Sequence, residues 1–109
     1  MVVYLLYSNW MHNGDNAVNE VIGVYDCLRK AQQVLANCIN LDLQYHPYSN
    51  VTSVGGRELE DYFLPELAAM FYDDPNFEFD VTSVKLWNGE HEECCEDFQE
   101  YNIEEHKLL

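Results

Sequence analysis

The side chains with the clearest chemical potential are carboxylates in the second half of the chain. Glu78 and Asp80 alternate along a predicted strand, which places them about 6.6 Å apart on one face. Carboxylates at such a density imitate the phosphates of a DNA strand, one per about 3.4 Å, and bind cationic side chains. The residues predicted to contact a partner are these acids together with two aromatic residues: Glu78, Asp80, Trp87, Glu90, Glu92, Glu93, Glu96, Asp97, Glu100 and Tyr101.

Negative charge is concentrated in this half. The 109 residues hold 20 acids and 5 Lys or Arg, for a formal net charge of -15. Residues 1–56 carry four acids and two bases, a net of -2, and residues 57–109 carry the other sixteen acids and three bases, a net of -13. A one-sided negative field steers basic partners and repels nucleic acid, so we expect no direct binding to DNA or RNA. The alternative is that the acids only keep a small protein soluble.

Metal binding and catalysis are the other chemistries that these residues suggest. His91, Cys94 and Cys95 supply zinc-type ligands, but adjacent cysteines on an extended chain point apart rather than around one ion. The surrounding carboxylates also disfavour a reactive thiolate. The sequence contains no phosphate-loop, dinucleotide, zinc-protease or nucleophile-elbow motif. We therefore expect no catalytic residue, no metal, no cofactor and no enzymatic activity.

The sequence also bears on the compartment. The apolar run Val2–Tyr7 lacks the basic residues and the cleavage site of a signal peptide. No apolar run approaches the roughly 20 residues that span a bilayer. Cys94 and Cys95 are adjacent, and Cys27 and Cys38 lie about 16 Å apart on a predicted helix, so neither pair has disulfide geometry. We expect reduced thiols, no membrane association and a cytoplasmic location.

Periodicity predicts the elements that position these residues. The β-branched and aromatic run Val2–Tyr7 is typical of a buried central strand, and Glu20–Tyr25 predicts a second strand joined to it as an antiparallel hairpin. From Asp26, in the N-cap position, apolar residues at a 3.6-residue period predict a helix to about Leu43. A polar loop follows, with a short extended piece at Val51–Val54.

The second half predicts a shorter helix and then strands. Residues 57–72 form helical turns interrupted at Pro65. Residues 77–87 alternate as in a strand with one wet face, which has a bulge at Ser83, where the apolar phase slips, and ends at Trp87. Asn88-Gly89 predicts a type I′ turn. Residues 90–109 are expected to form a charged edge strand or an irregular arm.

Together these elements predict one α+β domain over residues 1–109. It has a small antiparallel sheet of three or four strands, with one long helix packed on a face and a second, shorter, Pro-interrupted helix. A chain of this length buries about two thirds of its unfolded surface, which is enough for one hydrophobic core without disulfides or a structural metal.

The small size, the one-sided acidity and the lack of catalytic motifs resemble phage-encoded inhibitors of host defence, including anti-CRISPR proteins that mimic nucleic acid. The order of two strands, the second at Glu20–Tyr25, and a helix carrying Arg29-Lys30-Ala31 is also similar to small phage and plasmid proteins built as strand, strand, helix, strand. The resemblance implies a stoichiometric inhibitor of a defence nuclease in the host cytoplasm. Its implied partner is a basic nucleic-acid-binding protein such as a CRISPR effector.

A different function is favoured by the aromatic content. Aromatic residues make up 14% of the chain and include eight tyrosines, and such side chains are enriched at protein interfaces. The alternative prediction is a non-enzymatic structural or regulatory phage or plasmid protein that self-associates through aromatic surface. The oligomeric state is left open between a monomer and a homodimer.

Overall fold

The computed structural model describes residues 1–12, 17–45, 48–54, 67–74, 76, 77, 79, 81–95 and 97–108. Its elements follow one another as β1 (Val2–Met11), β2 (Val18–Tyr25), α1 (Leu28–Tyr45), β3 (Asn50–Val54), α2 (Leu67–Asp73), β4 (Ser83–Asn88), the 3-10 helix η3 (Glu92–Cys94) and β5 (Asp97–Lys107).

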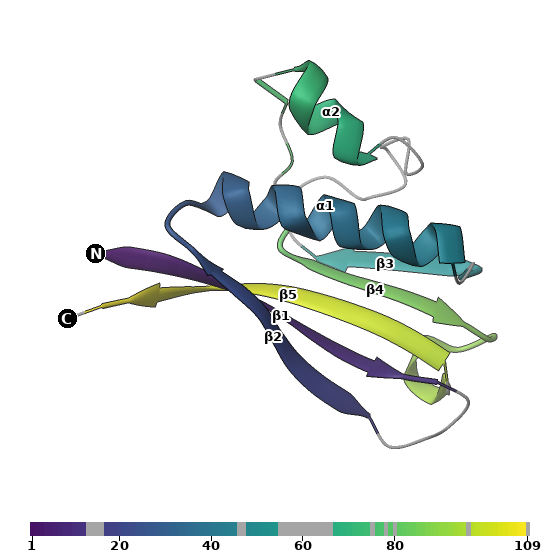
Figure 1. The fold of residues 1–109 in the computed structure, drawn as a ribbon. Helices are drawn as coiled ribbons and strands as arrows, with labels where there is room; N and C mark the ends of the chain where they lie inside the picture. The colour runs from purple at the N-terminus through teal and green to yellow at the C-terminus, as the bar shows by residue number, and fades with distance from the viewer. Residues whose placement is uncertain are drawn as a thin grey trace.

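The strands form one antiparallel sheet of five strands in the order β2-β1-β5-β4-β3 (Figure 1). The predicted α+β class, the hairpin of β1 and β2 and the interior position of β1 are confirmed. The predicted burial of β1 is wrong, because only Leu6 and Ser8 are buried and the other face of the strand is half-exposed. The sheet has five strands rather than three or four because both the short piece after α1 and the acidic C-terminal segment pair with neighbours.

The C-terminal segment differs most from its prediction. It is neither an edge strand nor an irregular arm, because β5 is 11 residues long and lies between β1 and β4. Its register pairs Ile103 with Leu6 and Tyr101 with both Ser8 and Val84. Backbone hydrogen bonds to two neighbouring strands stabilise this segment despite side chains with low strand propensity, since strand formation depends on pairing more than on local preference.

Two local predictions about helix and turn are wrong. The helix α1 begins at Leu28 rather than directly after Asp26, and Asp26 Oδ1 instead accepts a hydrogen bond of 2.8 Å from Lys30 Nζ, one turn into the helix. Gly89 adopts a φ of 124°, as glycine readily does, but β4 and β5 are joined through η3 and not by a two-residue type I′ turn.

The predicted strand at residues 77–87 is confirmed only in its second part, where β4 spans Ser83–Asn88. Phe77, Phe79 and Val81 are buried, which explains the alternation, but they lie before β4, which begins at Ser83. The change of phase at Ser83 therefore marks the start of a strand rather than a bulge. Of the predicted Pro-interrupted helix, the described part is α2, and Pro65 lies outside the described residues.

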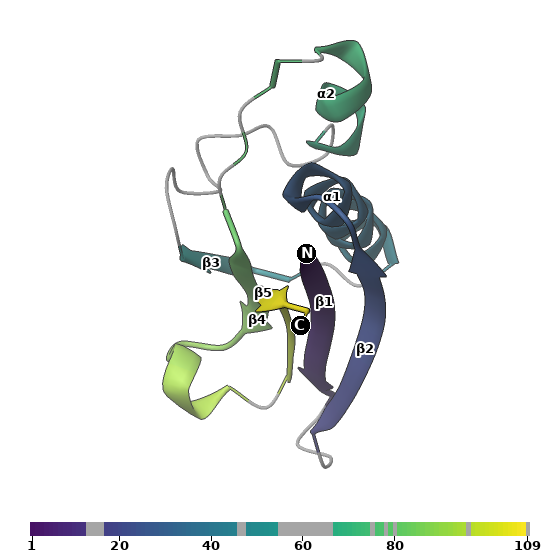
Figure 2. The ribbon, with the colours of Figure 1, turned by 90° about the vertical axis from the view of Figure 1, so that its left-hand side faces the viewer.

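The helix α1 packs on one face of the sheet, and α2 packs on the far side of α1 (Figures 1 and 2). The inner face of α1 is an apolar stripe at helical spacing, which contacts apolar side chains of β1, β4 and β5. The fully buried residues of this interface are Leu6, Leu35, Ala36, Ile39 and Leu86. Among the described elements, α1 and α2 both lie on one side of the sheet, which leaves the opposite face without an α-helix.

Candidate binding surface

The face of the sheet opposite α1 is called the open face here, and it is defined by Leu5, Tyr7, Val21, Glu100 and Glu104. Successive strand residues alternate between faces, and the pairing of Leu5 with Glu104 and of Tyr7 with Val21 brings these side chains to one side. Among the described elements, η3 lies over the β3–β4 end of this face, and none covers its β2–β1 end (Figure 2).

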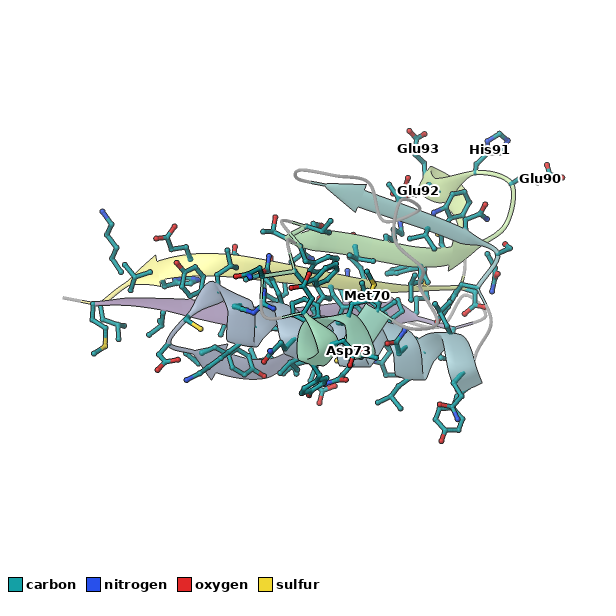
Figure 3. The ribbon with its side chains drawn as sticks, turned by 90° about the horizontal axis from the view of Figure 1, so that it is seen from above. Met70, Asp73, Glu90, His91, Glu92 and Glu93 are labelled. Carbon is teal, nitrogen blue, oxygen red and sulfur yellow. The ribbon has the colours of Figure 1, made fainter. Side chains whose placement is uncertain are left out.

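The exposed acids of the predicted set come from the segment before β5. Glu90 and Glu93 are exposed and project away from the sheet (Figure 3). Glu92 is half-buried and holds η3 in place, because its Oε2 accepts a hydrogen bond of 3.3 Å from Thr52 and its carbonyl one of 3.4 Å from Lys85 Nζ. The predicted residues Glu78, Asp80 and Glu96 lie outside the described residues.

The remaining predicted residues divide between the two faces. Glu100 is half-buried on the open face, opposite Lys85 of β4. Trp87 is half-buried and donates from Nε1 to the Thr52 hydroxyl at 3.1 Å. Asp97 and Tyr101 turn toward the α1 side, where Asp97 Oδ2 accepts a hydrogen bond of 2.9 Å from Asn88.

Tyr101 is a core residue, so its predicted role as a surface anchor is wrong. Its side chain is 5% exposed and its hydroxyl donates to Asp42 Oδ2 of α1 at 2.5 Å. Burial raises the pKa of Tyr101, and the hydrogen bond to the Asp42 carboxylate raises it further. The hydroxyl therefore remains a donor and links β5 to α1.

Replacing Tyr101 with phenylalanine is expected to lower the free energy of unfolding by about 1–3 kcal/mol, because the Asp42 carboxylate then loses a charge-assisted hydrogen bond. Urea unfolding followed by circular dichroism measures the change. Tyr45→Phe, at a residue that is 76% exposed, is the control and should leave stability unchanged. Unaltered stability of Tyr101→Phe together with weakened partner binding would restore the anchor role and contradict the structural one.

The described basic residues are mostly engaged within the molecule. Arg29 donates to the carbonyls of Phe77 at 2.7 Å and Asp74 at 3.3 Å. Lys30 pairs with Asp26, and Lys85 Nζ lies 4.6 Å from the centre of the Phe98 ring.

The exposed acids, by contrast, lack such partners. Within the described residues, Glu90, Glu93 and Glu105 form no ion pair, and Glu104 Oε2 lies 3.4 Å from His106 Nε2. Among the described residues, the carboxylates of Glu90, Glu93 and Glu105 are therefore not neutralised by an ion pair.

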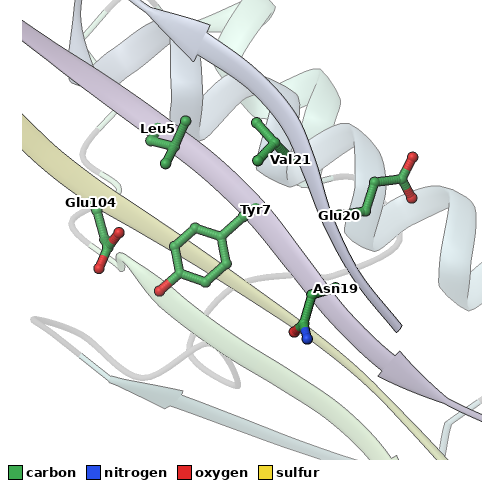
Figure 4. A pocket seen from close by; sticks show the side chains of 6 residues that line it. All are labelled: Leu5, Tyr7, Asn19, Glu20, Val21 and Glu104. Carbon is green, nitrogen blue, oxygen red and sulfur yellow. The ribbon is translucent and has the colours of Figure 1, made fainter. Parts of the chain in front are cut away.

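A hollow on the open face is a feature that the sequence did not indicate. It has a volume of about 300 Å³ and is lined by Leu5, Tyr7, Asn19, Glu20, Val21 and Glu104 (Figure 4). Glu104 was absent from the predicted set, although it follows Glu100 at a spacing that keeps both acids on one face of a strand. That signal becomes usable only once β5 is known to be a strand.

Other chemistry finds little support in the described residues. Burial raises the pKa of the Cys38 thiol to about 11, with the Asp42 carboxylate as the second cause, so this thiol is held protonated. No three His, Cys, Asp or Glu side chains of the described chain are gathered as a metal ion requires. None of the helices in that part combines the length and apolar character that a membrane crossing needs.

Comparison with known proteins adds no assignment. No protein-family model matches the chain, and searches of curated proteins and of solved structures find no match. The function is therefore argued from the chain's own residues.

Proposed function

We propose that this protein is a non-enzymatic, stoichiometric inhibitor that occupies the basic nucleic-acid-binding groove of a host defence nuclease such as a CRISPR effector, in the host cytoplasm. The proposal rests on which charged side chains have a partner within the molecule and which do not. Three of the four described Lys and Arg side chains contact a backbone carbonyl, a carboxylate or an aromatic ring, whereas Glu90 and Glu93 project from the surface and form no ion pair with a described residue.

The physical consequence is a negative field around Glu90 and Glu93. Unneutralised carboxylates on one side of a small protein raise the local concentration of basic partners and speed their association. Arg and Lys in a nucleic-acid groove are arranged to meet negative charges, and they do not distinguish the source of those charges. The acids thus compete with phosphates for the same groove. On the open face of β5, Asn102 lies between Glu100 and Glu104. These two carboxylates are therefore four residues apart rather than two, and the charge density along the strand is lower than for acids at alternate positions.

Binding to a CRISPR effector at two salt concentrations tests the proposal. Retention of the effector by the immobilised protein is expected at about 50 mM salt and should fall sharply by about 500 mM. At the higher concentration, salt screens the attraction between charges that lie more than a few ångströms apart. Retention that is unchanged at the higher salt concentration would contradict electrostatic mimicry.

Self-association is the second candidate, and the exposed edge of the sheet favours it. Val18, Val21 and Val24 of the edge strand β2 are 40%, 60% and 59% exposed. An edge strand with exposed aliphatic side chains is a template for pairing with another chain. The candidate interface is aliphatic here rather than aromatic.

Sedimentation analysis separates this candidate from the first. Two copies that each carry a net charge of -15 repel one another, so a dimer through β2 should strengthen as salt is added. Val24→Lys should dissociate such a dimer, whereas Leu41→Lys on α1, at 53% exposure, should not. A monomer at millimolar concentration in high salt contradicts self-association.

A further inference from the structure

The β2–β1 end of the open face combines aliphatic surface with carboxylates. Leu5 and Tyr7 are half-buried and Val21 is 60% exposed, and no helix among the described elements covers them. Exposed aliphatic side chains that form a continuous surface commonly mark an interaction site. The volume of the hollow, about 300 Å³, is at the lower end of what small-ligand sites have.

The charged groups at the hollow are all acids. Glu20 and Glu104 line it, and no Lys or Arg does. Glu104 lies near His106, but both side chains are about half exposed, at 53% and 51%, so this contact is weak. The Glu104 carboxylate also accepts a hydrogen bond from the Tyr7 hydroxyl, and its two oxygens have further acceptor sites for a ligand. A ligand in the hollow therefore meets hydrocarbon from Leu5 and Val21 and negative charge from Glu20 and Glu104.

Tyr7 adds an aromatic ring between these groups. In Figure 4 its hydroxyl end lies toward the Glu104 carboxylate. Burial raises the pKa of Tyr7, and the charges of Glu104 and Glu100 raise it further. The phenol thus stays neutral, and its ring face suits a cation that is also bound by the carboxylate.

These features favour one class of ligand. A metal ion would leave the hydrocarbon unused, and an uncharged apolar group would leave the carboxylates unpaired. Lysine has an aliphatic stem but ends in a point charge. Arginine has an aliphatic stem and a planar group that both stacks on a ring and bonds a carboxylate through two donors.

We infer that the open face receives an arginine side chain of the basic partner, with its stem against Leu5 and Val21 and its guanidinium at Glu104. The inference rests on the proposed function, because it names the partner chemistry that one part of the acidic surface recognises. Glu90 and Glu93 attract the partner at long range, and the hollow then contributes a specific contact.

Calorimetry with three short peptides tests the inference. In each peptide, serine alternates with one other residue, which is arginine, lysine or citrulline. The arginine peptide should bind most tightly, and the citrulline peptide, which has the shape of arginine without its charge, should bind least. Glu104→Gln should weaken binding of the arginine peptide by about tenfold, as expected for a charge-assisted, two-donor contact.

Glu105→Gln is the matched control, because it removes the same charge from the neighbouring exposed residue on the other side of β5. It should weaken binding less than about twofold. Equal losses for both variants, or equal binding of the arginine and lysine peptides, would overturn the arginine site and leave the proposed function standing. Failure of the unaltered protein to bind either basic peptide at low salt would instead overturn the proposed function.

Discussion

Replacing both Glu90 and Glu93 with lysine is expected to weaken binding to a basic nucleic-acid-binding partner by about a hundredfold. Each substitution turns an attraction into a repulsion, and like charges brought together at an interface cost several kcal/mol. Both side chains project from the surface and pair with no cation among the described residues, so their loss removes charge without removing a structural contact. Surface plasmon resonance at low salt measures the change, which should appear mainly in the association rate.

A matched pair of substitutions separates position from net charge. Asp73→Lys and Glu105→Lys replace two exposed acids, at the end of α2 and on the α1 side of β5, neither of which forms an ion pair with a described residue. Each substitution removes one acid and adds one base, so either pair moves the net charge from -15 to -11. We expect the control pair to weaken binding by less than about fivefold. Equal effects of the two pairs would mean that only total charge matters.

Phe71→Ala is expected to have the largest effect on stability, with a loss of about 3–5 kcal/mol in the free energy of unfolding. Phe71 is 4% exposed and packs edge to face against Phe77 and Phe79, with ring centres 5.0 and 5.5 Å away. The Arg29 guanidinium lies over the same ring, 5.1 Å from its centre. Truncation therefore leaves a cavity and removes the contact that ties α2 to the start of α1.

Tyr72→Ala is the control for that substitution, because Tyr72 is the next residue of α2 and is 70% exposed. Urea unfolding should show a change within about 0.5 kcal/mol for this variant. A small effect of Phe71→Ala would contradict the packing of α2 on α1. If Phe71→Ala were as stable as the unaltered protein but lost partner binding, the aromatic cluster would belong to the binding surface instead.

Elements with local signals could be predicted from the sequence. The continuous apolar run of β1 and the 3.6-residue period of α1 arise from side chains a few residues apart, so they appear in the sequence itself. The strand β5 has no such signal, because its stability comes from pairing with β1 and β4, which are distant in sequence. Its four consecutive polar or charged residues before Leu108, Glu104 to Lys107, are not typical of a central strand.

The side to which each acid of the candidate surface points is not predictable from the sequence, for the same reason. Residues 57–109 were correctly identified as the acidic half, but the side to which each acid points depends on whether its segment is a strand. Neighbours in a strand face opposite ways, so Glu100 and Tyr101 cannot both belong to one surface. Tyr101 turns to the core and Glu100 to the open face. The register that places Glu104 beside Leu5 is a property of the whole sheet.

Competition with nucleic acid tests the central claim most directly. A labelled DNA duplex bound by a CRISPR effector is titrated with the protein, and its fluorescence anisotropy is followed at low salt. Occupancy of the groove predicts that the anisotropy falls to the value of free DNA at about one protein per effector, and that the variant with lysine at both Glu90 and Glu93 requires far more protein. DNA that remains bound while the protein also binds the effector would contradict the claim, since the two would then occupy different sites.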